Sequence, residues 1–325
     1  MTFPAIDVVI LSWNRADLTL ATIENVLAQQ GVQTHIWLVD QGSQPEDLAR
    51  IRTAAAAHEN VALTELDGNI GVPGGRNLGM RLGKAEYILG LDNDAIFEEP
   101  GALLAIVQHF KAQPELGILG LRIKNYYNQQ DDPNWWAYPR ALFAQRQQPF
   151  LATRFSGCAH AIRRSMLEKT RGYDEALFFY WEELDLAYQF IQHGYLIRYE
   201  PSIAVLHKVS PEARVRWEHN RYYYLVRNIL YLSLKYERRY GYTLLQAGGY
   251  FLKGIFNRLG RQAVTGIKDA FIMSFQARRT WQLDNPALSQ QARAYLYEHD
   301  TRHRGNLWRR MLQEVLVKLP GHESR

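Results

Sequence analysis

Apolar runs alternate with helical patterns in the first part of the chain. The runs at residues 6–11, 35–40 and 61–66 have the length of buried strands, and segments 16–30 and 45–58 have apolar residues at helical spacing. This β-α-β-α-β order predicts a largely parallel sheet covered by helices. Ligands of such sheets bind at the carboxyl ends of the strands, so we expect the polar residues that follow each run to line a site.

A fourth apolar run ends in the tripeptide Asp92-Asn93-Asp94. Alternate residues of an extended chain point the same way, so Asp92 and Asp94 can direct their oxygens at one point. Carboxylate oxygens are preferred ligands of hard divalent cations, which makes this pair a candidate metal site. The alternative is a solvated turn with two surface acids, because short motifs often match by chance.

Residues 69–79, just before this run, contain four glycines and a proline. Glycines let backbone N–H groups approach a phosphate closely, and the start of a following helix adds positive potential. The segment is neither the G-x-G-x-x-G of a dinucleotide fold nor a P-loop. It is therefore either a nucleotide-binding loop before a short helix or a tight structural turn.

The pattern after Asp94 is weaker. It predicts a helix at 100–113, a strand at 116–123, a strand at 154–162, a short helix at 164–169 and extended segments at 195–200 and 202–206. Residues 125–149 are expected to form a long irregular connection that contains Trp135, Trp136 and Tyr138. These aromatic side chains either stack on a sugar or pack the connection onto the core.

A second group of chemically distinctive residues follows. An aromatic block at residues 178–181 precedes Glu182, Glu183 and Asp185, which open a predicted helix. Carboxylates at a helix N-terminus are favoured by the helix dipole, so these acids are either caps or reactive groups. His207 ends the extended segments, and a lone histidine there is either structural or a metal ligand.

Composition and charge divide the chain. The 325 residues are 47% hydrophobic and 22% charged, which is typical of a globular protein. Cys158 is the single cysteine and no early segment resembles a signal peptide, so we expect a cytoplasmic protein. Residues 1–207 carry 17 Lys and Arg against 24 Asp and Glu, whereas the remainder carries 21 against 9. The sequence therefore predicts one domain at 1–208 and a basic helical region at 209–325.

Helical patterns in the basic region, at 217–236, 243–259 and 262–279, interleave aromatic residues with Arg and Lys. Arg227 and Lys253 interrupt the runs that approach the roughly 20 apolar residues of a membrane span. The helices either lie on an anionic membrane surface, at the inner face of the plasma membrane, or pack on the first domain. No nucleic-acid partner is expected, because no reading motif accompanies the charge.

Five segments, in order, resemble glycosyltransferase family 2, and especially its bacterial rhamnosyl- and galactofuranosyltransferase-like branch. They are VVILSWNR, NIGVPGGRNLG, LDNDA, GYDEALFFYWEELDL and YEPSIAVLH, and the similarity covers about residues 5–210. Agreement in order as well as content argues against chance. The resemblance implies a GT-A fold: a Rossmann-like, mostly parallel sheet flanked by helices, here with the basic helical region added.

The resemblance also implies a donor side of the site. Asp92 and Asp94 would bind a divalent metal, Mn²⁺ or Mg²⁺, and the diphosphate of a nucleotide sugar, and His207 would be the third metal ligand. Asp40 would contact the pyrimidine base. The residues on the nucleotide side would be Ser12, Asn14, Asp40, Asn69, Gly75, Arg76, Asn77 and Asp92.

On the acceptor side, Glu183 would be the general base, at a position where the family usually has aspartate. Glu182 is the alternative base, and Asp185 would support the site. The implied enzyme is inverting and transfers a UDP- or dTDP-linked sugar to a glycan or lipid-linked glycan in cell-envelope polysaccharide assembly. Two other functions stay open: a sugar-1-phosphate nucleotidyltransferase, which typically has its glycine-rich loop directly after the first strand, and a non-catalytic carbohydrate- or membrane-binding protein.

Overall fold

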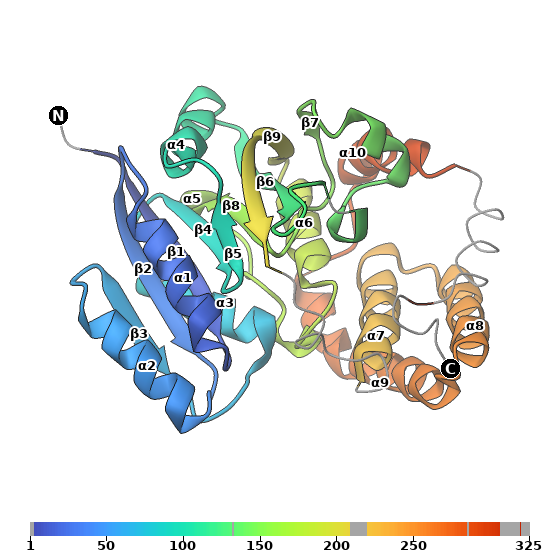
Figure 1. Cartoon of the computed structure of the whole chain (residues 1–325). Coiled ribbons are helices and arrows are strands. Elements are labelled where there is room, and N and C mark those ends of the chain that lie inside the picture. Colours follow the sequence, from blue (N-terminus) through green and yellow to red (C-terminus); the bar gives the residue numbers. More distant parts are fainter. Residues whose placement is uncertain (1–2, 132, 209–219, 285, 306–318, 320–325) are drawn as a thin grey trace. The chain divides into compact units, whose positions relative to one another are not determined.

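The computed structural model describes residues 3–131, 133–208, 220–284, 286–305 and 319 (Figure 1). The chain divides into two compact units. The first consists of Met1–Phe178 and Glu182–Ser210, and the second of Phe179–Trp181 and Pro211–Arg325. Three residues, Phe179–Trp181, therefore group with the second unit although the chain on both sides of them belongs to the first.

A mixed sheet is the centre of the first unit. In its described residues the strand order is β3-β2-β1-β4-β8-β6-β9-β5, and β7 pairs with β9 (Figure 1). The strands are β1 (Ala5–Ser12), β2 (Gln33–Asp40), β3 (Val61–Glu65), β4 (Tyr87–Asp92), β5 (Ala95–Phe97), β6 (Leu116–Asn125), β7 (Phe150–Leu151), β8 (Ala159–Arg163) and β9 (Leu196–His207). The first four strands are parallel, as predicted, whereas β8 runs antiparallel to both β4 and β6.

Helices pack on both faces of this sheet. They are α1 (Ala16–Leu27), α2 (Pro45–Ala56), α3 (Gly71–Leu82), α4 (Ala102–Ala112), α5 (Arg164–Leu167) and α6 (Glu182–Gln192). Val8 and Ile10 of β1 belong to the same buried cluster as apolar residues of α1, α2 and α4. Val9, which points to the opposite face, lies against α3.

The glycine-rich segment is mostly helix, which corrects the expectation of a loop. α3 begins at Gly71, whose φ of 83° is in the left-handed region. A Cβ on Gly79 would lie 2.4 Å from Val9 Cγ1, and a Cβ on Gly75 would lie 2.9 Å from Leu11 Cδ2. These two glycines therefore allow α3 to pack directly on β1, because any side chain there would overlap the strand.

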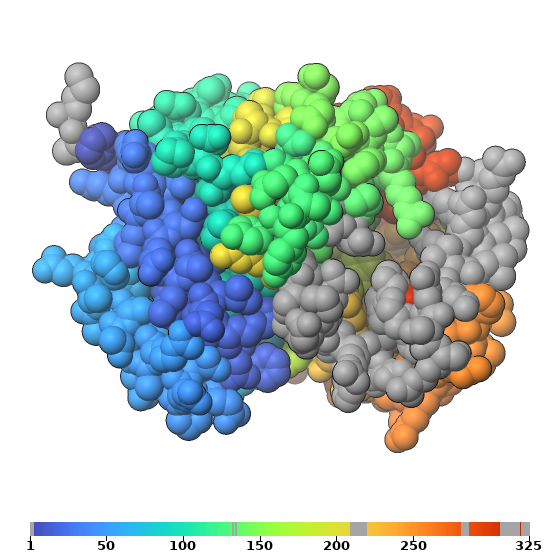
Figure 2. Space-filling model, viewed as in Figure 1, coloured from blue at the N-terminus to red at the C-terminus, as the bar shows by residue number. Residues whose placement is uncertain are grey.

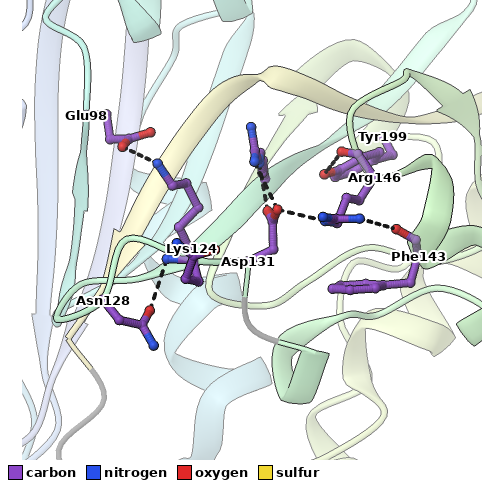
Figure 3. Close-up of polar contacts among 9 residues, drawn as sticks. Glu98, Lys124, Asn128, Asp131, Phe143, Arg146 and Tyr199 are labelled. Carbon is purple, nitrogen blue, oxygen red and sulfur yellow. Dashed lines mark hydrogen bonds and ion pairs between the residues drawn. The ribbon is translucent and has the colours of Figure 1, made fainter.

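The long connection between β6 and β7 is irregular, as predicted, with short 3₁₀ turns. Asp131 accepts hydrogen bonds from Arg122 at 2.7 Å and from Arg146 at 2.9 Å (Figure 3). The rings of Trp136 and Tyr199 pack edge to face with centroids 5.3 Å apart. Figure 2 shows the connection, in green, in front of the sheet, with small areas of yellow β9 visible. Packing onto the core is thus the role observed for Trp136.

The described part of the second unit is helical: α7 (Tyr222–Leu232), α8 (Tyr240–Phe256), α9 (Gly260–Asp284) and α10 (Gln290–His299), with a π-helical turn after α7. Val226 of α7, Ala247 of α8 and Ala263 of α9 share one buried cluster. A Cβ on Gly254 would lie 2.7 Å from Ala263 Cβ, so α8 and α9 approach closely at this glycine. Among the described residues, none of the helices combines the length and apolar character that crossing a membrane requires.

Some predicted boundaries were wrong. Residues 154–158 are not a strand, because β8 begins at Ala159. The two extended segments before His207 form one strand, β9, whose pairing with β6 shifts register between Leu121 and Arg122. The pattern did not predict β5 or α10. Residues 217–219, the start of the first predicted C-terminal helix, lie outside the described residues.

Candidate active site

The predicted metal ligands meet at the ends of three strands. Asp92 is the last residue of β4, and Asp94 lies in the turn that leads into β5. β5 pairs with β9 in a register that places Ala95 opposite His207. This pairing brings His207 Nε2 to 3.0 Å from Asp94 Oδ1, although the two residues are 113 positions apart.

Cys158 lies in the same group. One ligand atom each of Asp92, Cys158 and His207 lie within 4.8 Å of one another. His207 Nδ1 is buried and makes no hydrogen bond with the described residues. Carboxylate and imidazole donors at this spacing suit a divalent cation such as Mn²⁺. The residues present therefore fit a metal ion. The thiol of Cys158 is a soft ligand, and Mn²⁺ would bind the carboxylate and imidazole groups in preference to it.

Two arginines provide positive charge beside these carboxylates. Arg76 of α3 lies with Nη2 2.9 Å from Asp92 Oδ1, and the same nitrogen donates to the Gly157 carbonyl at 2.6 Å. Arg15, at the start of α1, has Nη1 3.0 Å from Asp94 Oδ2. Arg76 is only 1% exposed, so its charge acts in a site with little water.

The charged groups have shifted pKa values. Burial raises the pKa of Asp92, an effect that the Arg76 charge opposes. Burial acts in the same direction on Asp94, but the hydrogen bond and charge of His207, together with Arg15, hold the pKa of Asp94 below its ordinary value. Burial alone would lower the pKa of His207, but the nearby Cys158 sulfur and Asp94 raise it to about 11. A metal ion binding His207 must therefore displace a proton.

Glu182 and Glu183 begin α6 and have different surroundings. Glu182 is 3% exposed, and its Oε2 has no hydrogen-bond partner among the described residues. Glu183 is half-buried, and its Oε1 would lie 2.0 Å from a Cβ on Gly157. Since the Gly157 carbonyl also accepts a hydrogen bond from Arg76, Glu183 lies next to the group that holds Asp92. Burial raises the pKa of both glutamates, most strongly that of Glu182.

Asp185, the third acid of α6, is fully buried. Its Oδ2 accepts a hydrogen bond from Gln189 Nε2 at 2.8 Å, and the same nitrogen donates to the Gly172 carbonyl at 2.9 Å. Asp185 therefore helps to fix α6 to the loop that precedes it.

The predicted nucleotide residues at the ends of β1 and β2 form a hydrogen-bonded loop pair. Asp40 is fully buried and accepts hydrogen bonds from Ser12 Oγ at 2.8 Å and from the Ser43 N–H at 2.9 Å. Asn14 has a left-handed backbone; its N–H donates to Ser43 Oγ, and its Oδ1 accepts from the Gln44 N–H. Asp40 thus organises the loops, and its contact with a base stays a prediction.

The residues predicted in the glycine-rich segment lie in three settings. Asn69 is exposed, and its Oδ1 accepts from the Gly71 N–H at 2.8 Å before α3. Gly75 packs on β1. Asn77 is buried, and both polar atoms of its side-chain amide bond to the backbone of Tyr173. Its Nδ2 donates to the Tyr173 carbonyl at 2.8 Å, and its Oδ1 accepts from the Tyr173 N–H at 2.9 Å. Asn77 therefore positions the loop before α6.

Comparison with known proteins places this geometry in a family. The model of the family described as glycosyl transferase family 2 matches residues 7–171, slightly more than half of the chain. The chain belongs to glycosyl transferase family 2. The predicted family is thereby confirmed, whereas its rhamnosyltransferase-like branch is not. The match ends before α6, so the acids of α6 and His207 lie outside the matched residues of this family 2 protein.

Relatives and solved structures support the fold. The chain is 23% identical over 245 residues to the poly-β-1,6-N-acetyl-D-glucosamine synthase of Staphylococcus aureus, covering 72% of this chain and 58% of that protein. A mannosyltransferase from Pyrobaculum calidifontis, solved with GDP-Man and Mn²⁺, superposes over 97% of this chain and 86% of its own, with a TM-score of 0.58 and 17% identity. GalNAc-T7, solved with UDP, GalNAc and Mn²⁺, gives a TM-score of 0.61 at 15% identity, over 81% and 54% of the two chains. The predicted GT-A fold is confirmed.

Two residues of this family 2 site, Cys158 and Arg15, were not predicted from the sequence, and neither was the position of a third, Trp135. Cys158 was judged only as a lone cysteine, and Arg15 carried no signal beyond its place after Asn14. Trp135 was expected to contact a sugar or to pack, and its ring lies edge-on to the His207 imidazole with centroids 4.4 Å apart. None of the three lies in a strand, and only the tertiary fold brings their side chains to the site.

Proposed function

We propose that this family 2 protein is an inverting, metal-dependent glycosyltransferase. It would move a sugar from a UDP- or dTDP-linked donor to a hydroxyl group of a glycan or lipid-linked glycan. One observation carries the proposal: Arg76 and Gly157 connect the Asp92 group to the carboxylate of Glu183. The groups proposed to stabilise the leaving diphosphate and the proposed base are therefore neighbours, which supports their action on one sugar.

The donor half would hold a divalent cation through Asp92, Asp94 and His207. Such a cation supplies Lewis-acid stabilisation of the charge that develops on the leaving diphosphate. Arg15 and Arg76, which lie 3.0 Å and 2.9 Å from the two aspartates, would share this task. The Mn²⁺ in both compared structures supports the choice of metal for this chain.

The acceptor half would use Glu183 as general base. Its half-buried carboxylate would accept the proton of the acceptor hydroxyl while that oxygen bonds to the anomeric carbon and the carbon–diphosphate bond breaks. A single displacement of this kind inverts the anomeric configuration. Glu182 is less suited to meet an acceptor, because it is 3% exposed. Asp185 would fix α6 in place.

The substrates are proposed from the relatives. The matched relative is named for synthesis of an N-acetylglucosamine polymer, and this chain spans somewhat more than half of that protein's length. A role in cell-envelope polysaccharide assembly fits this name, whereas the rhamnosyltransferase-like branch stays a prediction from the sequence. A lipid-linked acceptor would place the protein in the cytoplasm at an anionic membrane surface.

A thermal-shift screen tests the donor half. UDP, dTDP, GDP and their sugars would be added with Mn²⁺ or Mg²⁺, and a ligand at about 100 times its Kd would add about 2.7 kcal/mol of stability. We expect the shift to require both nucleotide and metal, and to disappear in Asp94→Asn. Glu59→Gln, an exposed acid before β3, is the control. A metal-independent shift, or no shift with any donor, would refute the proposal.

A further inference from the structure

The outward face of α8 consists of aliphatic and aromatic residues and glycines. Every exposed residue of this helix is hydrophobic or glycine: Tyr240, Gly241, Leu244, Leu245, Gly248, Phe251, Leu252, Ile255 and Phe256. Leu244 is 61% exposed and Leu252 57%. Single exposed apolar residues are normal on protein surfaces, but a contiguous set usually marks a binding surface. We call these nine residues the α8 face.

Helical geometry makes the α8 face continuous. Residues 240, 244, 251 and 255 follow helical spacing along one side, and residues 245, 252 and 256 lie next to them. The opposite side of the helix is already packed, because Ala247 is in the buried cluster with α7 and α9. Tyr222 of α7 also donates a hydrogen bond to the Tyr250 carbonyl at 2.7 Å. The α8 face is therefore additional to the side that forms the core of the unit.

Basic residues stand at both ends of the α8 face. Arg238 and Arg239 precede the helix, and Arg258 and Arg261 follow it, all exposed. Between residues 238 and 279 the sequence has eight Lys and Arg against one acid, Asp269. The Asp269 carboxylate accepts a hydrogen bond from Tyr223 Oη at 2.8 Å. Near the α8 face the charge is thus strongly positive.

We propose that α8 lies in the interface of an anionic lipid bilayer, with its axis along the membrane plane. Its apolar side chains would enter the acyl boundary, and the flanking arginines would bind lipid phosphates. An acidic protein could satisfy the arginines, but nine exposed positions whose side chains carry a single polar atom, the Tyr240 hydroxyl, match a membrane interface better than a mixed protein surface. The inference deepens the membrane contact of the proposed function, since a lipid-linked acceptor is found at that surface.

Vesicle binding tests this assignment without any sugar transfer. The full chain would be sedimented with vesicles of phosphatidylglycerol and phosphatidylcholine in equal parts, and with phosphatidylcholine alone. We expect binding to the anionic vesicles. The partition coefficient of the double variant Leu244→Gln, Leu252→Gln should be lower by about tenfold or more, because two apolar side chains that would enter the bilayer are replaced by polar ones. The double variant Arg258→Gln, Arg261→Gln should lose about tenfold on anionic vesicles and nothing on neutral ones.

Tyr297→Gln is the matched control, because Tyr297 is 62% exposed on α10. It should bind as the unchanged chain does, and equal loss in this variant would contradict the role of α8. Two further results would overturn the proposal: no binding to either vesicle, or self-association of the chain in solution that Leu252→Gln abolishes. The nucleotide thermal shift, measured on the same variants, should stay intact. If neither the unchanged chain nor any variant showed the nucleotide thermal shift, the proposed donor site would be refuted, independently of the vesicle-binding result.

Discussion

Glu182 and Glu183 are neighbours on α6 whose side chains have different tasks in the proposed reaction. Glu183 is half-buried beside Gly157, whereas Glu182 is almost fully buried and carries an unpartnered oxygen within the described structure. A base must meet its substrate, and a buried acid next to Arg76 can instead adjust the electrostatics of the site.

Glu183→Gln should lower kcat by about 10²–10⁴-fold, because it removes the group that accepts the hydroxyl proton. The Kd of the nucleotide, from the metal-dependent thermal shift, should change by less than about threefold, since the donor ligands are untouched. Steady-state kinetics with a nucleoside-diphosphate release assay gives kcat. Glu182→Gln is the comparison, and a larger loss of kcat in that variant would transfer the role of base to Glu182.

Glu182→Gln should stabilise the protein at alkaline pH. Burial raises the folded-state pKa of Glu182 well above its ordinary value of 4.5, because the folded protein favours the neutral acid. The stability that Glu182 contributes is therefore fully present below pH 4.5 and is lost as pH rises through the raised pKa. Removing the acid abolishes this loss. Urea unfolding at about pH 8 and about pH 5 should show a larger gain for the variant at the higher pH. An equal gain at both would contradict the assigned burial.

At the scale of elements, α3 links the two halves of the site. Its Arg76 reaches Asp92 and Gly157, and its Asn77 holds the loop before α6. The helix can do so because Gly71 starts it in a left-handed conformation against Phe178, whose carbonyl accepts a hydrogen bond from the Val72 N–H at 2.8 Å. A shift at this start would move both Arg76 and Asn77.

Gly71→Ala should destabilise the fold by about 2 kcal/mol or more. Its φ of 83° disfavours any side chain, and the new Cβ would lie 2.5 Å from the Phe178 carbonyl oxygen. Chemical denaturation measures the loss. Gly68→Ala is the control, since a Cβ there meets nothing within 4 Å and φ is not positive. Equal effects of the two substitutions would show that the start of α3 is not strained as described.

At the scale of the whole molecule, the second unit holds the residues that directly precede the acids of α6. Phe179–Trp181 group with that unit, and Tyr180 and Trp181 have left-handed φ values of 76° and 71°. Asn228 of α7 is fully buried, and its Nδ2 donates to the carbonyls of Phe179 and Tyr180, both at 2.8 Å. Because Trp181 is bonded to Glu182, a restraint on Phe179–Trp181 can affect the position of the proposed base through the chain.

Asn228→Ala should cost about 2 kcal/mol of stability, because two half-buried carbonyls lose their donor. It should also lower kcat, since the backbone before Glu182 is released, while the shift caused by nucleotide and metal stays. Activity and thermal-shift assays on the same preparation separate the two effects. Thr265→Ala, an exposed position on α9, is the control in the same unit. An unchanged kcat in Asn228→Ala would mean that this restraint does not reach the acids.

Local periodicity determined much of the fold. Apolar runs and helical spacing at residues 6–66 were enough to predict the parallel strands and α1 and α2, because the burial of each element depends on its own pattern. The same reasoning predicted Asp92 and Asp94 at a strand end; Asp92 does end β4, whereas Asp94 lies in the turn after it and not in an extended segment. The basic, aromatic character of the C-terminal helices was equally readable from the sequence.

Tertiary structure alone decided which distant groups meet. The pairing of β5 with β9 brings His207 to Asp94, and the close packing of α3 on β1 brings Arg76 within hydrogen-bond distance of Asp92. A short window of sequence encodes neither the strand register nor the helix packing. Burial, which distinguishes Glu183 from Glu182, depends on every neighbouring element. For the same reason α8 could be recognised as an outward apolar face only once its other side was seen packed on α7 and α9.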